Sequence, residues 1–223
     1  MRRAELTDPQ CVAKIGSGRG FIVEQRLLVC DPLRRFVKKR RIITAGHCLP
    51  KLPIAFVDSS LRDRTYDNLL GSLDEAKPNI WVECLFVDPI ADIAVLGCPD
   101  CQDYCDQADA YDDFVDERPP MRIGEPRNGP GWMLSLANRW VPIRLKVHKS
   151  IYGVRLEIDA TDAGQSGSPI LRSDGRAVGL IAIGQETTDV ETGKKINLRS
   201  GGQPILVRNL PMWLLNSYRI SGN

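Results

Sequence analysis

The stretch DAGQSGSPI, residues 162–170, places two glycines, two serines and a proline between two apolar segments. Glycine weakens a strand, so two of them here indicate a turn whose backbone needs unusual angles. Such a turn exposes the hydroxyl of Ser166, which lies between the two glycines. Taken alone, this pattern is better explained as a β-turn than as a site, so its meaning depends on residues elsewhere.

A histidine and a carboxylate elsewhere in the chain give the serine a chemical context. His47 follows the apolar run of IITAGHC (42–48), and Asp92 begins the apolar run DIAVLG (92–97). An Asp at the head of a buried strand can accept the proton of an imidazole nitrogen, which fixes the tautomer of the ring. Asp88 is the rival carboxylate, although its place before Pro89 is typical of a turn. Taken singly, the histidine and Asp92 fit a packed ring and a strand cap.

A serine becomes a nucleophile only when a base removes its proton and N–H groups receive the oxyanion that forms. His47 is the candidate base, and Ser166 is the candidate nucleophile. The backbone N–H groups of Gly164 and Ser166 are the candidate oxyanion donors, and Gly167 lets a substrate backbone come close. We therefore expect His47, Asp92 and Ser166 to form a catalytic triad.

Three segments in the order His, Asp, Ser resemble the signatures of the chymotrypsin/trypsin-like serine protease superfamily. They are TAGHC (44–48), DIAVL (92–96) and GQSGSP (164–169). GSGRGFIV (16–23) resembles the strand before the histidine segment, and AVGLIAIG (177–184) resembles the strand that lines the specificity pocket. The likeness is to the bacterial HtrA/Deg-type branch, as a stand-alone peptidase domain without a PDZ region. It implies a serine endopeptidase that cleaves protein substrates through an acyl-enzyme; the alternative is a catalytically silent binding module of the same fold.

Short apolar runs separated by turn residues predict an all-β protein. The resemblance implies two six-stranded antiparallel β-barrels and a C-terminal helix. We expect a first barrel at 11–98, an acidic linker at 99–120 and a second barrel at 121–223. Within these ranges we expect long loops at 59–78 and 185–202, a strand at 203–209, and the terminal helix at 209–218.

The resemblance also implies the position of the specificity pocket. Its residues would be Ala160, Thr161, Ala182, Ile183 and Gly184, which form an apolar pocket for a small or medium side chain. Asp159 and Asp162 flank Ala160, so a shift of one residue would instead favour Arg or Lys.

Activation is expected to differ from that of secreted relatives, where a new N-terminal ammonium pairs with an Asp beside the nucleophile. The corresponding residue here is Gln165, which is neutral. We expect segment 162–166 to be ordered without N-terminal cleavage, by neighbouring loops such as 185–202 or by a regulatory protein partner.

Composition and charge exclude several other classes of protein. The 223 residues are 43% hydrophobic and carry a net charge of +2, which argues against nucleic-acid partners. No apolar run approaches the roughly 18 residues of a membrane span. The N-terminal MRRAELTDPQ lacks the apolar stretch of a secretory signal, so we expect a cytoplasmic protein without membrane contact.

Seven cysteines, an odd number, argue against a disulfide framework, and a Cys30–Cys48 bridge has no support. Cys98, Cys101 and Cys105 could start a zinc site if His148 or Cys84 completed it, but we expect thiols, with no metal or cofactor. The basic run LRRFVKKRR (33–41) fits a solvated hairpin tip, and the alternative is a docking surface for an acidic partner or nucleic acid.

Overall fold

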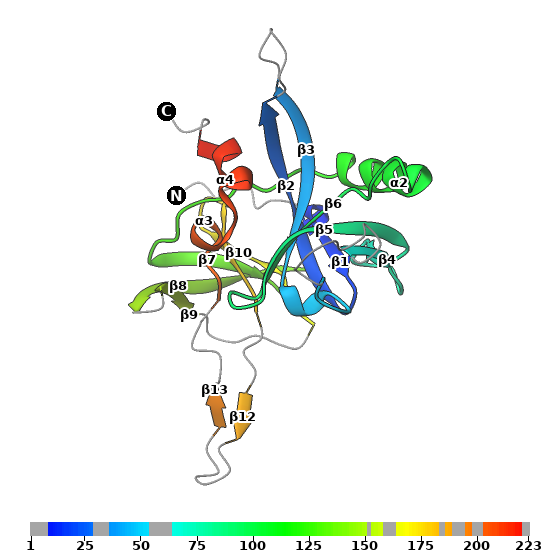
Figure 1. Ribbon diagram of the computed structural model, residues 1–223. Coiled ribbons are helices and arrows are strands. Elements are labelled where there is room, and N and C mark those ends of the chain that lie inside the picture. The colour runs from blue at the N-terminus through cyan, green and yellow to red at the C-terminus, as the bar shows by residue number, and fades with distance from the viewer. Residues whose placement is uncertain are drawn as a thin grey trace.

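The structure is a computed structural model in which strands dominate (Figure 1). It describes residues 9–28, 36–53, 64–150, 153–157, 164–182, 186–188, 195–197 and 203–219. No helix in this part of the chain is long and apolar enough to cross a membrane.

The first half of the chain forms a closed antiparallel barrel in the order β1-β2-β3-β6-β5-β4. Pairing of β1 with β4 closes the ring. The strands are β1 (Val12–Ile15), β2 (Gly18–Leu28), β3 (Phe36–Thr44), β4 (Thr65–Gly71), β5 (Ile80–Asp88) and β6 (Ile93–Gly97). The 3₁₀ turns η1 (Pro9–Cys11) and η2 (Gly46–Cys48) precede β1 and follow β3.

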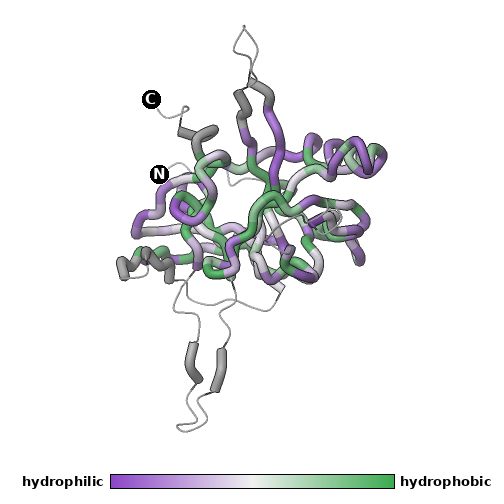
Figure 2. The backbone as a smooth tube through the Cα atoms, viewed as in Figure 1, coloured by the Kyte–Doolittle hydropathy of each residue, from purple (hydrophilic) through white to green (hydrophobic). Residues whose placement is uncertain are grey.

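Apolar side chains fill this barrel. Phe21, Ile43 and Leu96 are among the fully buried residues, and all five residues of β6 are buried. The continuous apolar run of DIAVLG therefore reflects a strand buried on both faces, not an alternating surface strand. Figure 2 shows this hydrophobic interior and the hydrophilic residues along β3 and helix α2 (Cys105–Asp116).

The second half forms a five-stranded antiparallel sheet in the order β11-β10-β7-β8-β9, among the residues that the structure describes. Its strands are β7 (Gly129–Leu134), β8 (Trp140–Ser150), β9 (Gly153–Glu157), β10 (Pro169–Arg172) and β11 (Ala177–Leu180). Two short strands, β12 (Glu186–Thr188) and β13 (Lys195–Asn197), pair with each other and extend away from the body (Figure 1). A closed barrel and a second antiparallel sheet confirm the expected all-β, chymotrypsin-like fold class.

The acidic segment between the halves holds a helix that the sequence analysis did not predict. In α2 the buried residues Ala108, Tyr111, Phe114 and Val115 lie on one face, while most of the aspartates are exposed. The helix contacts β5 and β3, so the apolar face covers the barrel. The many aspartates concealed this pattern, because helix periodicity was outweighed by polarity.

Three further expectations need correction. The expected loop 59–78 contains β4, whose Tyr66, Leu69 and Leu70 are buried in the barrel. The expected loop 185–202 contains β12 and β13. The expected strand at 203–209 is instead mostly the short helix α3 (Leu206–Asn209), and the terminal helix α4 (Met212–Arg219) begins after Pro211, not at Asn209.

The two halves meet through backbone contacts as well as the shared core. The amide of Met121 donates to the carbonyl of Ile22 (2.7 Å), which attaches the start of the second half to β2. Helix α4 packs against β2 and α3 against β11. These contacts join the second half of the chain to β2 of the barrel.

Candidate active site

His47 and Asp92 reach the same edge of the barrel because β3 and β6 are paired neighbours. Thr44 lies opposite Ala94 in this antiparallel pair. His47 follows β3 in the turn η2, and Asp92 immediately precedes β6. Gly46 leaves room for the carboxylate, because a Cβ there would lie 3.2 Å from Asp92 Oδ1.

Asp92 holds His47 with both carboxylate oxygens. Its Oδ2 lies 2.7 Å from His47 Nδ1, and its Oδ1 accepts the backbone N–H of His47 at 2.9 Å. The Asp92 residue is 4% exposed, whereas a third of the His47 side chain is exposed. A carboxylate at Nδ1 makes that nitrogen the donor, which leaves Nε2 free to act as a base.

The rival carboxylate, Asp88, binds backbone amides of its own turn. Its Oδ1 accepts the backbone N–H groups of Ile90 (2.9 Å) and Ala91 (3.0 Å). These two bonds form a side chain-to-backbone turn, as the position of Asp88 before Pro89 predicted. Asp92 is thus the carboxylate that contacts His47.

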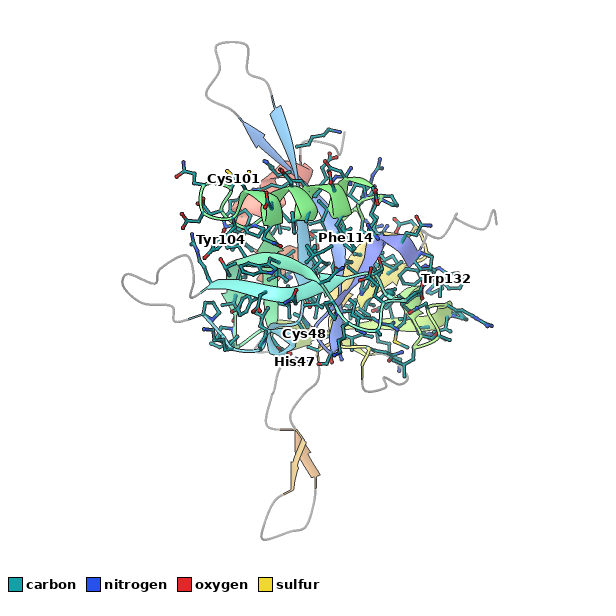
Figure 3. The ribbon with its side chains drawn as sticks, turned by 90° about the vertical axis from the view of Figure 1, so that its right-hand side faces the viewer. His47, Cys48, Cys101, Tyr104, Phe114 and Trp132 are labelled. Atoms are coloured by element: carbon teal, nitrogen blue, oxygen red, sulfur yellow. The ribbon has the colours of Figure 1, made fainter. Side chains whose placement is uncertain are left out.

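Ser166 lies beside the turn that carries His47. Its carbonyl oxygen accepts the backbone N–H of Arg19 (2.7 Å) and faces Cys48 Sγ (3.7 Å). Figure 3 shows His47 and Cys48 next to each other, on the side of the barrel opposite α2. Since Cys48 directly follows His47, these contacts place the serine and the histidine in neighbouring positions.

No hydrogen bond joins Ser166 Oγ to His47 in the described part of the chain, and the Ser166 residue is 4% exposed. In free enzymes the bond between nucleophile and base is often long and shortens when substrate binds. The structure therefore brings His47 and Asp92 into direct contact and places Ser166 near them without that last bond.

Two amide groups of the turn around Ser166 have no hydrogen-bond acceptor among the described residues. Neither the N–H of Gly164 nor that of Ser166 donates a hydrogen bond within the described residues, whereas Gly167 N–H donates to Ile181 O (2.7 Å). Gly164 has φ +88°, a backbone conformation that favours glycine. Two free N–H groups on a fixed turn beside a serine are suited to an oxyanion.

Residues of the expected specificity pocket are only partly described. Ala182 is half-buried, and its N–H donates to the side chain of Gln203. Six positions of this region lie outside the described residues: Asp159, Ala160, Thr161, Asp162, Ile183 and Gly184. The expected apolar character of the pocket stays a prediction.

Three buried polar residues around the site were not predicted. Thr44 Oγ1 donates to Arg19 O (2.6 Å), and Gln165 Nε2 donates to Leu134 O (3.2 Å). Arg19 itself is 6% exposed. The only signal for them was their position inside or beside the motifs, because a buried Arg and a surface Arg look the same in a sequence.

The cysteines show no cluster with a metal-binding arrangement, and no group of three His, Cys, Asp or Glu among the described residues could hold an ion. Burial raises the pKa of the Cys48, Cys84 and Cys98 thiols to about 11, while Cys101 and Cys105 are exposed. Cys30 lies outside the described residues, as does the His148 side chain.

The described part of the basic run is largely paired within the protein. Lys38 Nζ lies 3.3 Å from Glu24 Oε2, and Arg41 Nε donates to Gln25 Oε1 (3.0 Å). Arg40 donates to Arg118 O (3.2 Å). The choice between a hairpin tip and a docking surface stays a prediction, because 33–35 lie outside the described residues.

Comparison with solved structures finds similarity to serine proteases, at low identity and with TM-scores below 0.5. The Rv3671c protease of M. tuberculosis is 15% identical with a TM-score of 0.45, covering 97% of this chain and 90% of that one. A human pathogenic astrovirus serine protease is 13% identical with a TM-score of 0.45, covering 81% and 86%. The HtrA-type protease AlgW is 14% identical with a TM-score of 0.47, covering 91% of this chain and 56% of that one.

No protein-family model and no curated protein matches the chain. The identities to the solved structures are too low to transfer an activity. The function is therefore inferred from the geometry of His47, Asp92 and the turn around Ser166.

Proposed function

We propose that the protein is a serine endopeptidase in which Ser166 is the nucleophile, His47 the general base and Asp92 the residue that orients His47. The observation that carries the proposal is the two-oxygen contact of Asp92 with His47, at 2.7 and 2.9 Å. A histidine that merely filled space would not need both its ring and its backbone held by one buried carboxylate.

The proposed reaction begins with acylation. Ser166 Oγ attacks the carbonyl carbon of a peptide bond, and its proton passes to His47 Nε2. The negative oxygen of the tetrahedral intermediate accepts the free N–H groups of Gly164 and Ser166. When the intermediate collapses, the C–N bond breaks and the proton on Nε2 moves to the leaving amine, which leaves an acyl-enzyme.

Deacylation repeats these steps with water. His47 Nε2 removes a proton from the water as it attacks the acyl carbon, and then returns that proton to Ser166 Oγ. Asp92 keeps Nδ1 protonated throughout and stabilises the imidazolium that forms twice per cycle. The products are a carboxylic acid and the regenerated enzyme.

A catalytically silent binding module of the same fold is the second candidate. It is favoured by the missing hydrogen bond between Ser166 Oγ and His47 in the described residues. The two free amides of the Ser166 turn count against it, because a binding module has no need of unpaired donors at that place.

A fluorophosphonate probe separates the two candidates, since it modifies an activated serine without requiring the natural substrate. We expect wild-type protein to be modified at Ser166, as located by peptide mass spectrometry, and to cleave casein or members of a peptide library. Ser166→Ala and His47→Ala should lower turnover by about four to six orders of magnitude. Asp88→Asn is the matched control, because it retains an oxygen for the turn amides, and it should keep full activity.

Modification of a different serine, or equal cleavage by wild type and Ser166→Ala, would refute the assignment. Absence of both modification and cleavage in wild type would favour the silent module. The proposal includes regulation by a protein partner, so the reaction is measured with intact protein alone and after addition of cell extract.

A further inference from the structure

Arg19 is a buried cation, and no carboxylate among the described residues pairs with it. It is 6% exposed and forms no ion pair with any described residue. Burial lowers its pKa from the usual arginine value, because a charged guanidinium loses hydration there. Burial of a charged guanidinium is unfavourable unless its N–H groups donate hydrogen bonds. The acceptors around Arg19 therefore show which segments it stabilises.

The guanidinium donates hydrogen bonds to one turn, the hairpin connection between β7 and β8. Its Nη1 donates to the carbonyl oxygens of Leu134 (3.4 Å) and Ser135 (2.9 Å). Its Nη2 donates to the carbonyl oxygen of Leu136 (3.2 Å) and to Asn138 Oδ1 (3.0 Å). The planar fork of arginine can reach four acceptors on a curved backbone, which the single ammonium of lysine cannot.

The β7–β8 connection that Arg19 binds also contacts the segment that precedes Ser166. Leu134 O, besides receiving Arg19, accepts Gln165 Nε2 at 3.2 Å, and Gln165 is 1% exposed. Leu136 Cδ2 lies 3.4 Å from where a Cβ on Gly164 would be. Gln165, which lies between the two residues with free amides, is thus bonded to the turn that Arg19 holds, and the Leu136 side chain of that turn lies near Gly164.

The backbone of Arg19 holds the other side of the same segment. Its N–H donates to Ser166 O (2.7 Å), and its own carbonyl accepts Thr44 Oγ1 (2.6 Å). Thr44 is the last residue of β3, three positions before His47. Arg19 therefore connects the histidine strand, the serine turn and the β7–β8 connection.

We propose that Arg19 is a positioning residue that holds the oxyanion segment 164–166 in its active arrangement from inside the fold. The amide side chain of Gln165 is neutral and cannot form an ion pair, so the charge that orders the segment comes from Arg19 of β2 and acts through the carbonyl groups of 134–136. The inference rests on the proposed function, since it assigns a role within that catalytic site.

The experiment compares Arg19→Met and Arg19→Lys with a matched control, Arg118→Met. Arg118 is also a partly buried arginine that donates to a carbonyl, Phe114 O (2.6 Å), and its pKa is likewise lowered by burial. It also donates to Ser72 Oγ (2.9 Å) and contacts none of the residues of the site. A second route is Asn138→Gly, which removes one acceptor of Arg19 and keeps the φ of +55° accessible.

Activity is measured as kcat and KM on a peptide ester, together with the affinity for a peptide boronate, whose tetrahedral adduct uses the oxyanion donors. We expect Arg19→Met to lower kcat about 10²- to 10³-fold, as loss of an oxyanion donor does, with KM changed little. Boronate affinity should fall in parallel, Arg19→Lys and Asn138→Gly should be intermediate, and Arg118→Met should match wild type. The low-field proton resonance of the His47–Asp92 bond should persist in all variants, which separates loop positioning from general damage.

Amide hydrogen exchange supplies a readout that needs no activity. Arg19→Met should speed exchange in 134–139 and 164–168 but not in β4, and Arg118→Met should leave both loops protected. Equal kcat and boronate affinity in Arg19→Met and Arg118→Met would overturn the proposal while leaving the proposed function intact. If wild type itself is inactive, the proposed function fails and the catalytic role of Arg19 with it. If Arg19→Met does not fold, Asn138→Gly decides by the same criteria.

Discussion

At Asp92 one residue meets two demands, one chemical and one conformational. Its carboxylate holds His47 by two hydrogen bonds, and its backbone has φ +57°. Asp and Asn tolerate this left-handed region better than other residues with a side chain. The position therefore limits both the functional group and the residues that can carry it.

Substitution of Asp92 should separate these two demands. Asp92→Asn keeps the backbone preference but offers His47 Nδ1 an amide, so we expect kcat to fall about 10⁴-fold with little change in stability. Asp92→Ala should lose similar activity and in addition unfold with a free energy lower by about 1–2 kcal/mol, because alanine is strained at this φ. Enzyme kinetics and urea unfolding measure the two effects, and equal stability of the two variants would contradict the conformational part.

Ser168 is an unusual residue of the site, because its buried Oγ has no hydrogen-bond partner in the described part of the chain. An unsatisfied buried hydroxyl is unfavourable, so Ser168→Ala should raise the free energy of unfolding by roughly 1 kcal/mol. Thr44→Val is the contrast, since it removes the bond to Arg19 O and should lower that free energy by about 1–3 kcal/mol. Urea unfolding of both variants checks this; a loss of stability in Ser168→Ala would mean that the hydroxyl has a partner.

At the scale of elements, α2 is the part that composition obscured. Its exposed face carries acidic residues, and its buried face packs on the barrel through Tyr111, Phe114 and Val115. Figure 3 shows Cys101 and Tyr104 at one end of this helix and Phe114 along it. Trp81 of β5 contacts the ring of Tyr104, with 5.5 Å between ring centroids, and thereby fixes that end to the barrel.

Thiol reactivity should reveal how this end of α2 differs from the core. Cys101 and Cys105 are exposed and should react first with iodoacetamide. Burial raises the pKa of Cys48, Cys84 and Cys98 to about 11, so at pH 8 only about one thiol in a thousand is the reactive thiolate. The modification of these three should therefore accelerate as pH rises toward 11. Mass spectrometry of timed samples measures this.

The control for the thiol experiment is unfolded protein. In urea without reductant all seven cysteines should react, as expected for a chain without disulfides. Fewer than seven would contradict the expected reduced state. Rapid reaction of Cys48 in folded protein would contradict its burial beside Ser166.

On the scale of the whole molecule, the site depends on how closely the two halves approach. At Gly167 the two halves lie so close that an added Cβ would be 1.8 Å from Arg19 O and 2.7 Å from Thr44 Oγ1. The residue also has φ +81°. Only glycine allows the serine turn of the second half to lie against β2 of the barrel.

Two alanine substitutions test this approach. Gly167→Ala should lower the free energy of unfolding by roughly 3 kcal/mol or more, because backbone atoms must separate. Gly164→Ala has a similar positive φ, but its nearest neighbour is the flexible Leu136 side chain at 3.4 Å, so about 1–2 kcal/mol is expected. Urea unfolding compares them. Similar losses at both positions would show that strain, not the contact of the halves, sets the cost.

Particular residues show how far the sequence alone could lead. Short apolar runs separated by turn residues were enough to predict the all-β fold class, because strand patterns and turn residues are local properties. The choice of His47 and Asp92 as partners depended on the resemblance of TAGHC, DIAVL and GQSGSP to a known family. Segments whose apolar residues are diluted by charge were misassigned. Tyr66, Leu69 and Leu70 of β4 and the buried face of α2 are recognisable only against the barrel surface that they cover.

The sequence by itself determined most of the strands, the order of the catalytic candidates and the glycines of the serine turn. It favoured Asp92 over Asp88 as the partner of His47, but only the tertiary structure shows Asp92 in contact with the ring and Asp88 bound to turn amides. The tertiary structure also decided that Arg19, Thr44 and Gln165 are buried around the oxyanion segment. The physical reason is that these contacts join residues at least 25 positions apart, and their energy depends on burial, which arises only when the two halves pack together.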